Sequence, residues 1–229
     1  MKHDIVYILK NDIDDTELIY SIRSVVKNFP YNRIWFAGGT PEHLEPDNFM
    51  PIKQAGQNKW EKVSNTLRLI CNNNDITEDF WLFNDDFFIM QPVNDFPAAV
   101  RGTMRNRILE LKKKHGYSSY ANQLERTELF LRTKGYDTLD YALHVPILIN
   151  KKKALETLKT FPNIPMFRCL YGNQHKLGGV YMDDVKIYEL NKKPTGDEIM
   201  LSTTDKSFNE GKVGPYIKAQ FPEKCKYEK

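Results

Sequence analysis

The sequence predicts an α/β protein whose mostly parallel sheet is flanked by helices, and three observations lead to this prediction. The chain has 229 residues, 41% of them hydrophobic and 12% aromatic, which is enough to bury a sizeable core. Residues 5–37 alternate a short apolar run, an amphipathic segment and a second apolar run, which is the order of a crossover unit with parallel strands. No internal repeat or low-complexity segment divides the chain. We therefore predict a single domain over residues 1–229.

The first three elements are defined by their apolar spacing. Residues 5–9 form a short continuous apolar run, which is typical of a buried strand. Apolar side chains then recur at helical spacing from Leu18 to Phe29, and Asp14 or Asp15 stands where the helix cap is expected. Residues 33–37 form a second apolar run that ends at a pair of glycines. These patterns predict a strand, a helix and a second strand.

The following segments continue the alternation with more loop. Residues 40–58 are rich in Pro, Asn and Gln and predict a loop. An amphipathic helix is expected from Trp60 to Cys71, and the apolar run at residues 80–83 predicts a strand that leads into Asn84-Asp85-Asp86. Further along, the sequence predicts basic helical segments at 97–114 and 122–133, strands at 143–149 and 180–190, a helix at 152–161 and polar, loop-rich chain over 191–229.

The N-terminus and the cysteines carry predictions about the environment of the protein. Met-Lys-His-Asp lacks the apolar run of a secretory signal, and the longest apolar stretch, around residues 80–90, is interrupted by two aspartates. Cys71, Cys169 and Cys225 are far apart and lack metal-ligand spacing, as expected for reduced thiols. We predict a cytoplasmic protein without a membrane span.

Charge is distributed unevenly along the chain. Residues 1–100 hold nine Lys and Arg against fifteen Asp and Glu, a balance of −6, whereas residues 101–134 hold nine against three, a balance of +6. The acidic half suits a metal, and the basic segment suits a polyanionic partner such as DNA or an anionic glycan. From charge alone, we favour the alternative that the basic segment is a solvated helix rich in Lys and Arg. The residues concerned are Arg101, Arg105, Arg107, Lys112, Lys113 and Lys114, with Tyr117 and Tyr120 nearby.

Asn84-Asp85-Asp86 is the strongest candidate for chemistry. Its two carboxylates stand between the aromatic runs at residues 80–83 and 87–90, where burying them unpaired would be costly. Carboxylate oxygens suit Mg²⁺ or Mn²⁺, and the carboxyl ends of parallel strands are where α/β folds bind ligands. The alternative is that the aspartates cap a helix or pair with arginine. We favour a metal site on Asp85 and Asp86.

Three further motifs are less specific. His144 lies in an apolar run, where a histidine is usually a core residue bonded to backbone. Arg168, the one arginine after residue 132, suits either a phosphate clamp or a surface ion pair. Tyr181-Met-Asp-Asp184 is similar to the catalytic hairpin of reverse transcriptases, but the chain is too short for that architecture. The common serine-hydrolase, zinc-protease and dinucleotide motifs are absent.

The order of elements up to Asp86 resembles the opening of nucleotide-sugar transferases of the GT-A type. In more detail, residues 14–30, Arg33-Ile-Trp-Phe36 and Phe83-Asn-Asp-Asp-Phe-Phe88 resemble the Stealth group, which includes bacterial capsule sugar-phosphate transferases and the lysosomal-enzyme GlcNAc-phosphotransferase. The sequence also resembles small phage-type glycosyltransferases that share Asn-Asp-Asp-Phe-Phe and end in a tail like residues 221–228. The resemblance covers most of residues 4–95 and isolated islands beyond them.

This resemblance implies a GT-A-like fold with a Mn²⁺ or Mg²⁺ ion on Asp85 and Asp86 and a UDP-type nucleotide sugar as donor. It also implies a donor and metal half over residues 1–95 and an acceptor half over residues 96–229. The implied catalytic residues are Asp86, His144 and Arg168, and the implied donor-binding residues are Asn11, Asp12, Lys59, Asn65 and Asn84. The chain departs from the Stealth pattern at Lys10-Asn11-Asp12, where Stealth proteins have Val-Asp-Gly.

The predicted function is therefore a metal-dependent glycosyltransferase that moves a sugar to an acceptor hydroxyl. The phage-type resemblance points to a hydroxymethylated DNA base as acceptor, which would have to be turned out of the stack. The alternative is a Stealth-type sugar-1-phosphate transferase acting on a glycan or capsule. Two further hypotheses are a binding module whose aspartates do not catalyse, and a two-metal nuclease that adds Asp183 or Asp184 to Asp85 and Asp86.

Overall fold

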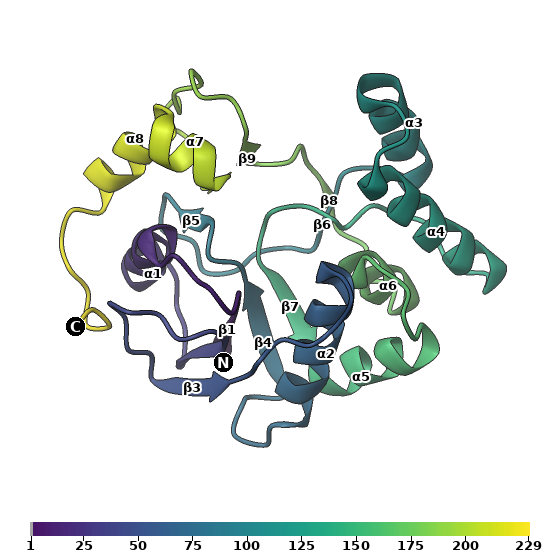
Figure 1. The fold of residues 1–229 in the computed structure, drawn as a ribbon, viewed down its shortest axis with the longest axis horizontal. Helices are drawn as coiled ribbons and strands as arrows, with labels where there is room; N and C mark the ends of the chain where they lie inside the picture. Colours follow the sequence, from purple (N-terminus) through teal and green to yellow (C-terminus); the bar gives the residue numbers. More distant parts are fainter. Residues whose placement is uncertain (1) are drawn as a thin grey trace.

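A five-stranded sheet forms the centre of the molecule in the computed structural model, which describes residues 2–229 (Figure 1). Its strands, in spatial order, are β3 (Asn48–Pro51), β2 (Ile34–Gly38), β1 (Asp4–Leu9), β4 (Asp79–Phe83) and β7 (Ile147–Asn150). The first four are parallel, and β7 runs antiparallel to β4. The protein is thus a mixed α/β fold with a mostly parallel sheet, as the sequence predicts.

Helices cover both faces of this sheet. They are α1 (Thr16–Asn28) on one face, and α2 (Lys59–Asn72), α5 (Lys151–Thr160) and α6 (Phe167–Gln174) on the other. Successive strand residues point to opposite faces, so Tyr7 of β1 lies in the same core as Ile22 of α1, whereas Val6 lies in the core that includes Leu67 of α2. Each buried aliphatic side chain of this kind stabilises the fold by roughly 1.5–3 kcal/mol.

A second, smaller sheet continues the chain beyond β4. It consists of β5 (Phe87–Ile89), β10 (Met200–Thr203) and β9 (Lys186–Ile187), and it is covered by α7 (Asp205–Glu210) and α8 (Val213–Gln220). β10 is antiparallel to β5 and parallel to β9. Phe88, Leu201 and Phe208 are buried in its core. This sheet brings the C-terminal part of the chain against the turn that follows β4.

A two-helix hairpin extends away from the central sheet (Figure 1). It consists of α3 (Met104–His115) and α4 (Ser119–Thr133), and a two-stranded sheet of β6 (Ala99–Val100) and β8 (Val180–Tyr181) lies at its base. Ile108, Leu124 and Leu170 share the core that joins the hairpin to α6. The basic residues at 101–134 therefore lie on and beside a projecting helical unit.

Several predicted elements differ from those observed. The predicted loop at 40–58 contains β3, a short edge strand whose residues alternate between half-buried and exposed. The predicted strand at 143–149 begins only at Ile147, and the predicted strand at 180–190 is two separate two-residue strands. The predicted loop-rich segment 191–229 contains β10, α7 and α8. These elements span two to eight residues, too few to establish a clear hydrophobic period.

Within residues 2–229, no helix combines the length and the apolar character that a membrane span requires.

Candidate active site

The candidate site lies where three strands of the central sheet meet. β1 and β4 are parallel neighbours, with Tyr7 opposite Phe83, so Lys10 and the turn Asn84–Asp86 emerge at the same edge. β7 runs the other way, with Ile147 opposite Leu82, and the residues that precede it reach this edge as well. Sheet register thus brings Asn84–Asp86 and the His144 segment to one edge, although they lie some sixty residues apart in the sequence.

Gly38 allows the ends of β1 and β2 to approach closely at this edge. It has a φ of 134°, and a Cβ atom there would stand 2.1 Å from the carbonyl oxygen of Leu9. Only glycine avoids that collision while adopting this φ. The glycine pair predicted at the end of the second strand therefore lets this part of the chain pass close to the backbone of Leu9 and Lys10.

Asp86 is buried and held by two donors. The residue is 7% exposed; Nζ of Lys186 lies 2.6 Å from its Oδ2, and Oγ of Ser202 donates to the same oxygen at 2.9 Å. The second sheet supplies both donors, because Ser202 of β10 pairs with Phe87 on one side and with Lys186 on the other. The other carboxylate oxygen, Oδ1, is buried and has no hydrogen-bond partner among the described residues. An unpaired buried oxygen of this kind is costly in the absence of a ligand.

The charges of Asp85 and Lys10 shift each other's pKa. Burial, followed by the charge of Asp86, raises the pKa of Asp85 to about 6, and Lys10 acts in the opposite direction. Burial lowers the pKa of Lys10, but the carboxylates of Asp85, Asp205, Glu17 and Asp86 together raise it above its ordinary value. The turn after β4 therefore concentrates negative charge that nearby cations balance only in part.

Glu17 adds a buried carboxyl group that the sequence analysis did not identify. It lies in the first turn of α1, and its Oε1 accepts a hydrogen bond from Oγ1 of Thr203 at 2.5 Å. Burial raises its pKa to about 7; the hydrogen bond from Thr203 opposes this shift, and the charges of Asp86 and Asp85 add to it. In the sequence Glu17 is one acidic residue of an amphipathic helix, and nothing there indicates that it is buried close to Asp85 and Asp86.

His144 is bound to Asp184 on the other side of the edge. Its Nδ1 lies 2.9 Å from Oδ2 and 3.1 Å from Oδ1 of Asp184, and its backbone N–H donates to the same carboxylate at 3.1 Å. Burial raises the pKa of Asp184, but the hydrogen bonds and charge of His144, with Arg101 at 3.9 Å, lower it below its usual range. The imidazole is 28% exposed. With Nδ1 fixed by a carboxylate, Nε2 is the nitrogen available to exchange a proton with a ligand.

Arg168 is half-buried and bonds the backbone around His144. Its Nη1 donates to the carbonyl oxygens of Leu143 and Val145, at 3.2 and 2.5 Å, which are the residues on either side of His144. Burial lowers its pKa to about 10, against the attraction of Asp86, and its guanidinium lies 5.6 Å from the ring centre of Phe87. Nη2 is buried without a partner among residues 2–229. These contacts support a role in positioning the His144 backbone, and the phosphate clamp that the sequence suggests for Arg168 stays a prediction.

The other residues predicted to bind donor make local contacts. Asn11 is exposed, and its Oδ1 accepts from the backbone N–H of Gln54 at 3.0 Å. Asp12 and Lys59 are exposed, and Asn65 donates to the carbonyl of Ala55 at 2.9 Å. Asn84 is half-buried in the turn itself. Asn84 thus lies within the site by chain continuity. Among residues 2–229, no hydrogen bond or ion pair joins Asn65 or Lys59 to the two aspartates, and their role stays a prediction.

Two features of the carboxylate pair suit a hard divalent cation. Asp86 offers a buried oxygen without a partner, and Asp85 carries a charge that its surroundings disfavour. No group of three or more His, Cys, Asp or Glu side chains within residues 2–229 has metal-binding geometry. Mg²⁺ sites of enzymes that use phosphate substrates commonly have one or two carboxylates and complete the shell with phosphate and water. Asp85 and Asp86 fit a site of that type.

Sequence reasoning also missed Lys186, Ser202 and the role of Asp184. Asp184 was considered only as part of a polymerase-like or nuclease motif, and its partner His144 stands 40 residues earlier. Ser202 lies in the segment predicted to be loop. A signal existed for Lys186, since Val185-Lys186-Ile187 alternates as in a half-buried strand, but nothing in the sequence identifies Asp86 as its partner.

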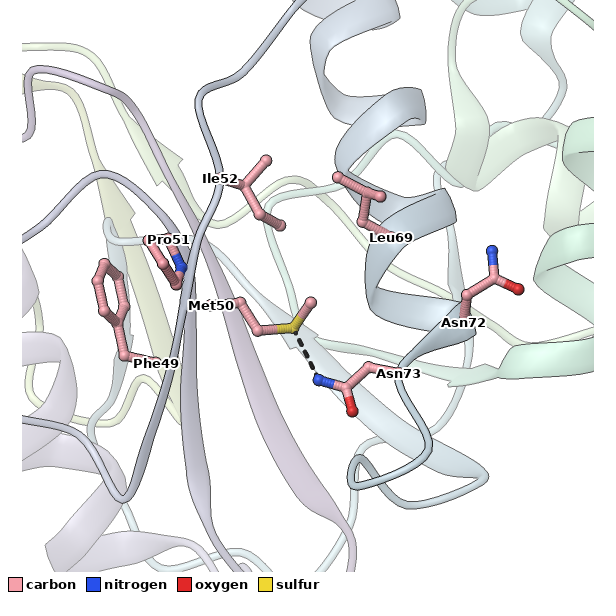
Figure 2. A pocket seen from close by; sticks show the side chains of 7 residues that line it. All are labelled: Phe49, Met50, Pro51, Ile52, Leu69, Asn72 and Asn73. Atoms are coloured by element: carbon pink, nitrogen blue, oxygen red, sulfur yellow. Dashed lines mark hydrogen bonds between the residues drawn. The ribbon is translucent and has the colours of Figure 1, made fainter.

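An apolar groove lies elsewhere on the molecule (Figure 2). It measures about 460 Å³ and lies between β3 and the C-terminal end of α2. Met50 and Ile52 approach it from the strand side, and Leu69 and Asn73 from the helix side, where Nδ2 of Asn73 donates to Sδ of Met50 at 3.2 Å. It contains no titratable side chain. The groove is therefore separate in chemistry and in position from the carboxylate turn.

Comparisons with known proteins add little to this geometry. No protein-family model matches the chain, and no curated protein matches it in sequence. Among solved structures, the chain is similar to the active-site mutant Q189E of LgtC, at 11% sequence identity and a TM-score of 0.39, over 73% of this chain and 68% of that chain. This match assigns no role to any residue here, and the roles given above follow from the chain's own contacts.

Proposed function

We propose that this protein is a glycosyltransferase that moves a sugar from a nucleotide sugar to an acceptor hydroxyl with the help of a divalent cation. The observation that carries the proposal is the meeting, at one sheet edge, of two unlike groups. One is the Asp85–Asp86 pair with its buried oxygen that has no partner among the described residues, and the other is the His144–Asp184 pair with a partly exposed imidazole. The first suits a diphosphate with its metal, and the second suits deprotonation of a hydroxyl.

The roles of the chain's own groups follow from this arrangement. Nε2 of His144 accepts the proton of the acceptor hydroxyl, while Asp184 fixes the ring through Nδ1 and stabilises the imidazolium that forms. The acceptor oxygen forms a bond to the anomeric carbon. The bond from that carbon to the diphosphate oxygen breaks, and its electron pair leaves with the diphosphate. Lys10, directly after β1, is exposed, and its charge acts on Asp85.

A divalent cation would be held by Asp85 and by Oδ1 of Asp86. When bound there, it supplies positive charge that stabilises the leaving diphosphate.

The acceptor is proposed to bind on the side of the α3–α4 hairpin. Arg101 joins this side to the site, since its Nη1 lies 3.9 Å from the carboxylate of Asp184. Arg105, Lys113 and Lys114 are exposed, whereas Lys112 is paired with Glu125 at 2.7 Å. A basic surface continuing from the candidate base suits an anionic acceptor, for which we propose a hydroxymethylated base in DNA.

The donor half of the proposal is tested first by binding. We expect Mn²⁺ with UDP or a UDP-sugar to raise the melting temperature of the wild-type chain, because a ligand that binds only the folded state stabilises it. Asp86→Asn should abolish the shift. Asp137→Asn, which changes an exposed aspartate outside the site, serves as the control. No shift with any nucleotide diphosphate or nucleotide sugar would refute the proposal.

Product analysis then separates the two transfer chemistries. Incubation with a radiolabelled UDP-sugar and either hydroxymethylated DNA or an anionic glycan should release UDP and label the DNA. Release of UMP would instead identify sugar-1-phosphate transfer, and label in the glycan alone would refute the DNA acceptor. Cleavage of DNA without a donor would identify the nuclease alternative.

A further inference from the structure

Asp86 already meets a cation in this structure, and that cation belongs to the chain. The ammonium of Lys186 lies 2.6 Å from Oδ2, and the two side chains are 15% and 10% exposed. Ser202 donates to the same oxygen. Oδ2 therefore carries two donors while Oδ1 carries none among the described residues. Asp86 is left with a single oxygen for any external ligand.

The segment that contains Lys186 also fixes the other half of the site. Asp184 and Lys186 lie two residues apart, a spacing that places side chains on the same side of an extended chain. Asp184 holds His144 and Lys186 holds Asp86. A three-residue segment thus sets both the candidate base and the candidate cation ligand.

The chain's own cations offset part of the negative charge around the carboxylate turn. Glu17, Asp85, Asp86 and Asp205 influence one another and Lys10. Lys186 is paired with Asp86, and Arg168 is attracted by the same carboxylate. A free divalent cation is bound strongly only where negative charge is in excess, and internal cations reduce that excess. A nucleoside diphosphate brings further negative charge to the same place.

We propose that Lys186 is a positioning residue that makes cation binding depend on the donor. By binding Oδ2, Lys186 fixes the carboxylate of Asp86 and lowers the affinity of the site for a free divalent cation. The cation therefore binds together with a nucleoside diphosphate. This inference rests on the proposed function, because it takes the donor to be a nucleotide sugar. It assigns Lys186 no contact with substrate.

The test is calorimetric titration of Mn²⁺ into the full chain, with and without saturating UDP. Wild type should bind Mn²⁺ about tenfold or more tightly in the presence of UDP than in its absence, because the diphosphate adds charge. Lys186→Met should bind Mn²⁺ alone about tenfold more tightly than wild type, since the competing ammonium is gone. The ratio of the Mn²⁺ affinity with UDP to the affinity without UDP should therefore be smaller in Lys186→Met than in wild type. Lys186→Arg, which keeps the charge, should retain the wild-type ratio.

The controls separate this inference from loss of folding and from the proposed function. Lys192→Met removes an exposed lysine six residues further along and should leave both affinities unchanged. Circular dichroism checks that each variant folds, and Lys186→Gln replaces Lys186→Met if the latter does not. Binding of Mn²⁺ alone that is equal to or weaker than wild type in the folded neutral variant overturns the role of Lys186. Wild type that binds Mn²⁺ but no UDP overturns the proposed function and the coupling with it, while the Mn²⁺ comparison still decides whether Lys186 competes for Asp86.

Discussion

The two halves of the candidate site are built in different ways. The Asp85–Asp86 turn is enclosed between two sheets, and its buried carboxylate is fixed by donors from β9 and β10. The His144 ring is more accessible, at 28% exposed. Asp184 binds its Nδ1, and Arg168 donates hydrogen bonds to the backbone carbonyls on either side of it. A buried, fixed carboxylate suits a ligand that must be held in one orientation, whereas a more open imidazole suits groups that arrive and leave with a proton. The contrast teaches that removing a carboxylate of the turn should impair binding, and that altering the histidine side should impair the rate.

Asp86→Asn is the sharpest way to test this contrast, and we expect the largest effect from it. Loss of the carboxylate charge should lower kcat/KM for sugar transfer by about 10³-fold or more, since charge stabilisation at a leaving group is commonly worth that much. Donor binding should fall with it. The measurement is steady-state transfer together with calorimetric titration of UDP in the presence of Mn²⁺. If Asp86→Asn kept the donor affinity of wild type, the expectation that the carboxylate turn governs binding would be wrong.

Asp184→Asn tests the other half, where a smaller loss is expected. The amide would no longer fix the histidine or stabilise its cation, so kcat should fall about 10²- to 10³-fold while donor affinity stays unchanged. Asp183→Asn is the matched control, because that neighbouring aspartate is exposed. The readout is kcat against KM for the donor. Equal losses in the two variants would argue against a role specific to Asp184.

Glu17→Gln sharpens the comparison by its effect on stability against pH. The folded-state pKa of Glu17 is raised from 4.5 to about 7, so the wild-type chain is most favoured with this group protonated and loses stability as the pH rises from about 4.5 to about 7. The neutral amide avoids that loss. Glu17→Gln should therefore be more stable than wild type at pH 8, by on the order of 2–3 kcal/mol, with little difference at pH 4.5. Urea unfolding at the two pH values measures it, and a pH-independent difference would contradict the assignment.

Arg168→Met is expected to have the smallest effect of the four. It removes the donor to the carbonyls of Leu143 and Val145 and leaves them buried without that partner, at a cost of about 2 kcal/mol. A positioning role predicts that kcat falls with this loss while donor affinity persists. Urea unfolding and donor titration are the measurements. Loss of donor affinity in a folded Arg168→Met chain would restore the phosphate clamp that the sequence suggested.

Asp85 and Asp86 could be predicted from the sequence, whereas the side chains that hold Asp86 and His144 could not, and the reason is physical. β1, α1, β2 and β4 bury continuous or amphipathic faces, so local spacing alone indicated them, and Asp85 and Asp86 stood out as carboxylates between aromatic runs. The partners Asp184, Lys186 and Ser202 lie on elements of two to four residues, or between them, and reach the site through contacts over 40 to 116 residues of sequence. Local periodicity carries no record of such contacts.

The pairing of β10 with β5 also has a consequence for synthesis. Ser202 reaches Asp86 across 116 residues of sequence, and Lys186 reaches it across 100. On a ribosome the carboxylate turn emerges long before its partners, so Asp86 lacks Lys186 until β9 has left the exit tunnel and lacks Ser202 until β10 has left it. Contacts between such distant segments also form slowly, because a long loop must close first. The candidate site is therefore among the last parts of the protein to be completed, and a chain that ends before residue 200 would contain all five strands of the central sheet without a finished site.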